Sequence, residues 1–255
     1  MREKCGCYNL KKITEMMKMY IWKLGIRVLI FVLMFAFYIS NKDLLCKFVT
    51  QTIWIGLTPI HLLWFIFMVM MIRHIFFSRK STMALRKAKQ TEYEEKEGYD
   101  RLALFEYVYD QNIKAWKVML IWLSFNAIFG ILYLLKLIDN ADLLMLTVFF
   151  FLCDYICILF YCPFQTEVMK NKCCVNCRIF DWGHFMMFTP MLFIKSFFSW
   201  SLFFTSLVVL IRWELIYAKY PERFWSGSNT KLNCEKCNDK ICKFKNIIID
   251  RGKAE

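Results

Sequence analysis

Two C-x-x-C motifs in this sequence have the residue types and spacing of a thiolate metal site. The first lies in the stretch KCCVNCRIFDWGH, and the second lies in NCEKCNDKIC near the C-terminus. A two-residue spacer lets both sulfur atoms of a pair face one ion, and two such pairs complete a tetrahedral ligand set. Lysine and arginine residues beside the cysteines favour thiolate over thiol. The predicted metal ligands are therefore Cys174, Cys177, Cys234 and Cys237.

The predicted metal is zinc, because zinc is the ion that four-cysteine sites most often hold as a structural clamp. An iron–sulfur cluster is the alternative, since all-cysteine sites also hold iron. Further candidate ligands lie close by in the sequence: Cys162, Cys173, Cys242 and His184. For His184, solvation at a membrane interface is a second interpretation. Two more interpretations of the cysteines stay open: unrelated redox or disulfide pairs, and reduced thiols without a special role.

Three polar residues fall within long apolar stretches, where burying them is costly. Asp154 lies near the middle of the stretch that ends before Pro163, and His61 and Asn126 lie in the two apolar stretches before it. His61 is the candidate partner of Asp154 if their two helices pack together, and Asn126 is a further candidate. The functional interpretation is a proton relay or an ion site. The alternative is a hydrogen bond between helices that fixes their packing.

A helical membrane bundle is the architecture that would have to position these residues. The chain has 255 residues, 58% of them hydrophobic, and it contains few glycines and prolines. Apolar runs of about twenty residues recur, which is the length that crosses about 30 Å of hydrocarbon as a helix. We therefore predict an all-α, polytopic integral membrane bundle with about five to six membrane segments and a cytoplasmic helical hairpin.

Changes between apolar and charged sequence divide the chain into seven segments. These are a basic N-terminal segment (1–18), membrane helices 1 and 2 (19–77), a charged cytoplasmic helical hairpin (78–117), membrane helices 3 and 4 (118–162), a Cys-rich cytoplasmic loop (163–184), a membrane hairpin or single long helix (185–217), and a basic tail (218–255). Within the predicted cytoplasmic hairpin, apolar residues recur at spacings of three and four, which indicates one face of a helix.

The orientation of the chain follows from its basic residues, which favour the cytoplasmic side of a membrane. Lysine and arginine are abundant in the N-terminal segment, in 78–117 and in the tail, so these segments are predicted to be cytoplasmic. The tail reaches that side if 185–217 turns back as a hairpin with its tip near Lys195. A single tilted span, which would place the tail outside, is the alternative. A shared four-cysteine site requires the hairpin, because both motifs must lie on the same side.

The net charge of +13 is accounted for by this cytoplasmic bias and by attraction to anionic lipid headgroups. No nucleic-acid-binding module is visible, so the predicted partners are the lipid bilayer and a protein. No Walker loop, G-x-S-x-G, H-E-x-x-H or dinucleotide motif occurs, which argues against most hydrolases, ATPases and NAD enzymes and leaves enzymatic activity open. Three functions remain: a metal-containing scaffold or regulator, a membrane redox protein, and a small ion- or proton-coupled transporter that uses Asp154.

Overall fold

The computed structural model describes residues 14–43, 45, 59–76, 83–171, 173–233, 236, 237 and 239. In this part of the chain every regular element is a helix, and one isolated antiparallel bridge joins Glu95 to Asn229. The prediction of an all-helical protein is therefore confirmed for the described residues.

Four helices are long and apolar enough to cross a membrane. They are α1 (Glu15–Ser40), α5 (Arg101–Leu134), α6 (Asn140–Leu159) and α8 (Phe197–Lys219). A fifth apolar helix, α3 (Pro59–Ile75), is shorter. Polar side chains fix where three of these helices begin, because each accepts a hydrogen bond from an otherwise unpaired amide of the first turn. These N-cap residues are Thr14 for α1, Asp100 for α5 and Asp139 for α6.

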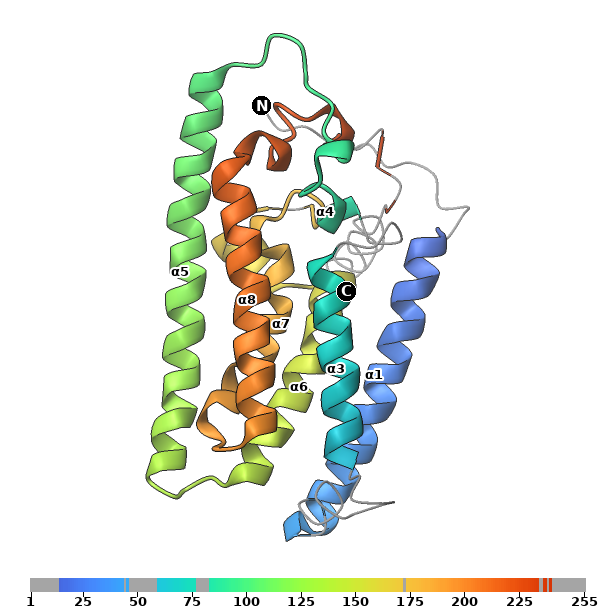
Figure 1. Ribbon diagram of the computed structural model, residues 1–255, viewed down its shortest axis with the longest axis vertical. Helices are drawn as coiled ribbons and strands as arrows, with labels where there is room; N and C mark the ends of the chain where they lie inside the picture. The colour runs from blue at the N-terminus through green and yellow to red at the C-terminus, as the bar shows by residue number, and fades with distance from the viewer. Residues whose placement is uncertain are drawn as a thin grey trace, which may run out of the picture.

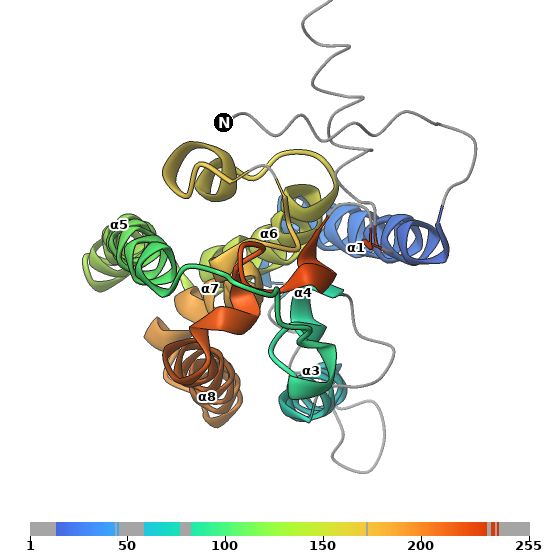
Figure 2. The same ribbon diagram turned by 90° about the horizontal axis from the view of Figure 1, so that it is seen from above.

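The helices form a bundle with α6 and the short α7 (Gly183–Phe188) in its middle. Figure 2 shows α1, α3, α8 and α5 arranged around this pair. α1 packs on α6, α3 packs on α8, and α7 contacts both α6 and α8. The largest buried side chains of α8, Trp213 and Tyr217, belong to the main apolar cluster. Large apolar side chains also cover the outward faces of the long helices, where they are exposed.

The stretch 185–217 turns back on itself close to the predicted tip at Lys195. α7 continues into the 3-10 helix η4 (Thr189–Phe193), and α8 then returns the chain alongside both elements. α5 makes room for this turn at Gly130, because a Cβ there would lie 2.4 Å from the ring of Phe193. α8 therefore returns the chain toward the end of the bundle that carries the Cys-rich loop (Figure 1).

The segment 78–117, predicted to be a helical hairpin, differs from that prediction in its first arm. After the short α4 (Met83–Arg86) and η1 (Gln90–Glu92) the described chain is extended, and Gly98 has a φ of +67°. Backbone pairing with the tail replaces the predicted helix: the amide of Thr230 donates to the carbonyl of Glu94 at 2.9 Å. The second arm is the first half of α5, whose periodic apolar face is largely exposed on the outside of the bundle.

Three segments that are distant in the sequence meet at one end of the bundle, the upper end in Figure 1. We call this region the cap; it consists of the described residues in 83–100, 164–182 and 220–239. The amide of Lys96 donates to the carbonyl of Ser228 at 2.9 Å, and Lys231 donates to the carbonyl of Thr91 at 3.0 Å. The start of α1 joins the cap, since the hydroxyl of Thr14 donates to the carbonyl of Asp239 at 3.2 Å.

Candidate functional site

The Cys-rich loop of the cap is folded around a buried lysine, Lys87. Its side chain is only 1% exposed, and its ammonium donates to the carbonyls of Val175 at 2.6 Å and Cys177 at 2.8 Å. The same ammonium faces the rings of Trp213 and Phe224 at 5.6 and 5.3 Å. Burial lowers the pKa of Lys87 to about 8, while the neighbouring cysteines act in the opposite direction. Lys87 thus fixes the backbone that carries the first C-x-x-C motif.

Both cysteines of the first motif are buried in this loop. The amide of Cys177 donates to the carbonyl of Cys174 at 3.2 Å, which closes a turn between them. The thiol of Cys174 donates to the side-chain oxygen of Gln165 at 3.5 Å. Burial raises the pKa of the Cys177 thiol to about 12, so this sulfur carries its proton at neutral pH. A metal ion bound here would displace that proton, as metals do when they bind cysteine.

The C-terminal tail packs directly on the Cys-rich loop. A small buried cluster contains residues from both segments: Val175, Leu232 and Cys237, with Cys173 packed against them. Cys237 is 8% exposed. Next to it, the ammonium of Lys236 donates to both carboxylate oxygens of Glu94 at 3.0 Å. One cysteine of the second motif therefore lies at the same end of the bundle as both cysteines of the first.

The structure describes only part of the predicted ligand set. Cys234 and Cys242 lie outside the described residues. Among the residues that are described, no group of three His, Cys, Asp or Glu side chains is arranged to hold a metal ion. Cys162 lies near Cys177, close enough to affect the charge of its sulfur. The ring of His184 packs edge-on against that of His74, with their centroids 5.0 Å apart.

Asp154 is paired with Arg27, so the predicted partners His61 and Asn126 are wrong. The guanidinium of Arg27 donates to the Asp154 carboxylate at 2.9 Å. His61 instead packs edge-on against Phe198, with ring centroids 4.8 Å apart. Asn126 donates within its own helix, to a carbonyl one turn earlier at 2.9 Å. The reason is helix packing: α1 lies against α6, which brings the arginine near the middle of α1 to Asp154.

The surroundings of this ion pair are tightly packed. Arg27 is 8% exposed, donates to the carbonyl of Phe151, and stacks on the rings of Phe151 and Tyr155 at 4.0 and 3.8 Å. α7 approaches it so closely that a Cβ at Gly183 would lie 2.5 Å from a carboxylate oxygen of Asp154. This geometry is that of a contact joining α1, α6 and α7. Transport through Asp154 stays a prediction that the structure does not test.

A second buried ion pair, missed by the sequence analysis, anchors the chain directly after the first C-x-x-C motif. Arg178 pairs with Glu214 of α8 and donates to the carbonyl of Gln111 on α5 at 3.1 Å. The indole of Trp182 donates to the other oxygen of Glu214 at 2.8 Å. A carboxylate inside the last apolar stretch was the available signal, since it needs a partner as much as Asp154 does.

A third polar contact connects α3 to the end of the Cys-rich loop. The imidazole of His74 lies 2.5 Å from a carboxylate oxygen of Asp181, which is buried.

No protein-family model, curated protein or solved structure matches this chain. The feature of the chain itself that bears most on its function is the meeting of the Cys-rich loop and the tail in the cap.

Proposed function

We propose that this chain is an integral membrane protein in which a metal–thiolate site clamps the C-terminal tail onto the cap. The ligands are Cys174, Cys177, Cys234 and Cys237, and zinc is the favoured ion. The protein acts as a scaffold or regulator that presents the clamped cap to a protein partner. One observation carries the proposal: Cys237 is buried against the loop that holds the first motif.

Residue spacing extends this observation to the complete ligand set. Cys234 precedes Cys237 by the two-residue spacer that brings both sulfur atoms of a pair to one ion. A Zn²⁺ ion with four thiolates has a net charge of about −2, which is costly to bury without compensation. The ammonium of Lys87, hydrogen-bonded to the backbone of the first motif, supplies positive charge at this place. The metal site would in turn account for a buried lysine that has no carboxylate partner among the described residues.

Insertion into a membrane is supported by the outward faces of the long helices. Leu29 on α1, Leu62 on α3 and Ile128 on α5 are all exposed, together with many other apolar residues of these faces. Contiguous apolar surface of this kind is unfavourable in water, whereas lipid solvates it. The described residues of 83–100 and 220–239, which both meet in the cap, include seven lysines and arginines, and this supports a cytoplasmic location for the cap.

Metal analysis of the purified full-length protein tests the proposal. The wild type is expected to contain about one zinc ion per chain, as a single four-cysteine site requires. C174S/C177S and C234S/C237S are each expected to lose most of it, because two thiolates alone bind zinc far more weakly. C46S/C153S removes the same number of cysteines elsewhere and should keep the metal. Full metal content in either of the first two variants would contradict a shared four-ligand site.

A second candidate is a membrane redox protein that holds an iron–sulfur cluster at the same place. The observation that favours it is the presence of further cysteines beside the proposed ligands: Cys162 near Cys177, and Cys173 packed against the cluster that contains Cys237. Such clusters are held by cysteine thiolates. Anaerobic purification followed by an absorption spectrum decides between the two. A brown protein with iron and sulfide supports the cluster, and a colourless protein that contains zinc excludes it.

A further inference from the structure

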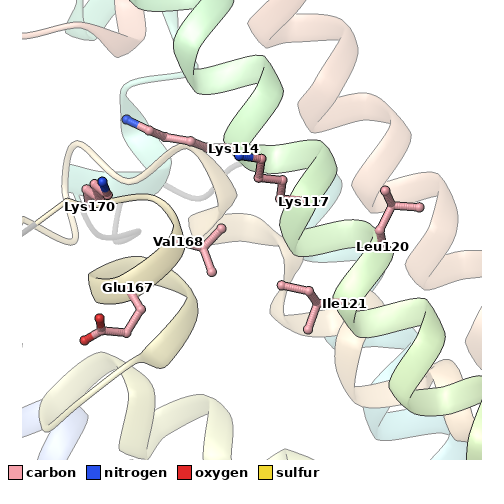
Figure 3. A pocket seen from close by; sticks show the side chains of 7 residues that line it. All are labelled: Lys114, Lys117, Leu120, Ile121, Glu167, Val168 and Lys170. Atoms are coloured by element: carbon pink, nitrogen blue, oxygen red, sulfur yellow. The ribbon is translucent and has the colours of Figure 1, made fainter.

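A groove of about 530 Å³ lies on the outside of the bundle, between α5 and the single-turn η2 (Phe164–Val168) (Figure 3). Its basic lining consists of Lys114, Lys117 and Lys170. Its apolar lining consists of Leu120, Ile121 and Val168. Figure 3 shows the lysines at one end of the groove, Leu120 and Ile121 farther along α5, and Glu167 on η2 away from the lysines. The groove is thus cationic at one end and mainly apolar along α5.

The groove lies at the level where a membrane surface is expected. Lys117 directly precedes the predicted third membrane segment, and η2 follows soon after α6 ends at Leu159. Two aromatic residues at this level are exposed, Trp116 to 68% and Tyr161 to 45%. Tryptophan and tyrosine are enriched at membrane–water interfaces. The lysines are therefore positioned beside lipid headgroups, with the apolar lining beside acyl chains.

The charge of the groove favours an anionic ligand. Lys114 pairs with Asp110 at 2.5 Å, whereas Lys117 and Lys170 have no carboxylate within ion-pair distance among the described residues. The one acidic residue in the lining, Glu167, accepts a hydrogen bond from the hydroxyl of Tyr161 at 3.0 Å. Lysine ammonium groups bind phosphate as point charges. Net positive charge next to apolar side chains complements a phospholipid, in which a phosphate group is joined to fatty-acid chains.

We propose that this groove binds one anionic phospholipid, with its phosphate among Lys114, Lys117 and Lys170 and an acyl chain along Leu120 and Ile121. The inference rests on the membrane insertion in the proposed function and is independent of the metal site. A lipid held here bridges α5 and η2, and η2 is the first part of the Cys-rich loop. The bound lipid therefore supports the part of the cap that carries the first C-x-x-C motif.

Lipid titration of the detergent-purified full-length protein, followed by native mass spectrometry, tests this inference. The probes are dioleoyl phosphatidylglycerol and dioleoyl phosphatidylcholine, which share acyl chains and differ in net charge. The wild type is expected to prefer phosphatidylglycerol. K114Q/K117Q/K170Q should weaken that binding about 10- to 100-fold, as expected for the loss of three lysines at a membrane surface. K96Q/K219Q/K231Q removes the same charge elsewhere at the same end of the bundle and should bind like the wild type.

Two results would overturn the inference: equal binding of both lipids by the wild type, or equal phosphatidylglycerol affinity in the two triple variants. Membrane insertion is checked separately by washing isolated membranes with alkaline carbonate. Release of the protein by this wash contradicts the proposed function. Retention of the protein together with unchanged lipid affinity in the groove variant contradicts the lipid site alone.

Discussion

Replacing Asp154 by leucine while Arg27 stays in place is expected to destabilise the protein by about 3–5 kcal/mol. The substitution leaves a buried guanidinium without its carboxylate, in a site where the carbonyl of Phe151 and two aromatic rings face it. Since the ion pair joins α1 to α6, α1 is expected to separate from the bundle first. The free energy of unfolding, followed by circular dichroism of the helices in detergent, measures the effect.

The double variant R27M/D154L separates the effect of the two charges on stability from the effect of side-chain packing. It removes both charges and keeps apolar volume, so it is expected to be clearly more stable than D154L, because apolar replacement of a buried pair is often neutral or stabilising. Gly183→Ala provides a geometric check, since its Cβ would lie 2.5 Å from the Asp154 carboxylate. It should destabilise the wild type, because the carboxylate that Arg27 holds in place would have to move. Equal stability of D154L and the double variant would contradict the assigned role of the pair.

Replacing Glu214 by leucine is expected to lower the free energy of unfolding by a similar amount, about 3–5 kcal/mol. The substitution leaves the buried guanidinium of Arg178 without its carboxylate partner. The indole of Trp182 also loses its acceptor. Because Arg178 directly follows Cys177, this loss should loosen the Cys-rich loop as well as the bundle. The expected result is a lower free energy of unfolding, together with faster proteolysis in the loop than in wild type.

Glu106→Leu serves as the control for this prediction, because Glu106 is an exposed carboxylate on α5. Exposed substitutions of this kind usually change stability by no more than about 0.5 kcal/mol. A second variant, Glu214→Gln, keeps an oxygen for Trp182 and should fall between wild type and Glu214→Leu. If Glu214→Leu behaves like the Glu106 control, the Arg178–Glu214 pair contributes little and the loop is held by other contacts.

Hydropathy was enough to predict the long apolar helices. Long apolar runs predict helices because a helix satisfies its own backbone hydrogen bonds, and α1, α5, α6 and α8 follow those runs. Length favoured a turn near Lys195 over a single tilted span, since 33 residues as one straight helix would extend about 50 Å. The meeting of the tail with the Cys-rich loop depended on that turn.

Contacts between helices were not predictable, because a single sequence shows which residues are apolar and not which faces meet. Asp154 clearly needed a partner, but choosing Arg27 over His61 required knowing that α1 packs on α6 while α3 packs on α8. The prediction of a helix in the first arm of the cytoplasmic hairpin was wrong for a related reason. Its extended backbone pairs with Asn229 and its neighbours, more than a hundred residues later, and no local pattern reports such a contact.

Whether both C-x-x-C motifs bind one ion is tested most directly by X-ray absorption at the zinc edge of the purified full-length protein. The shared clamp predicts four sulfur ligands at about 2.3 Å in the wild type. It also predicts that C234S/C237S loses its zinc or retains only two sulfur ligands, with the remainder nitrogen or oxygen. Four sulfur ligands in C234S/C237S, or a wild-type zinc bound mainly by nitrogen and oxygen at about 2.0–2.1 Å, would contradict it.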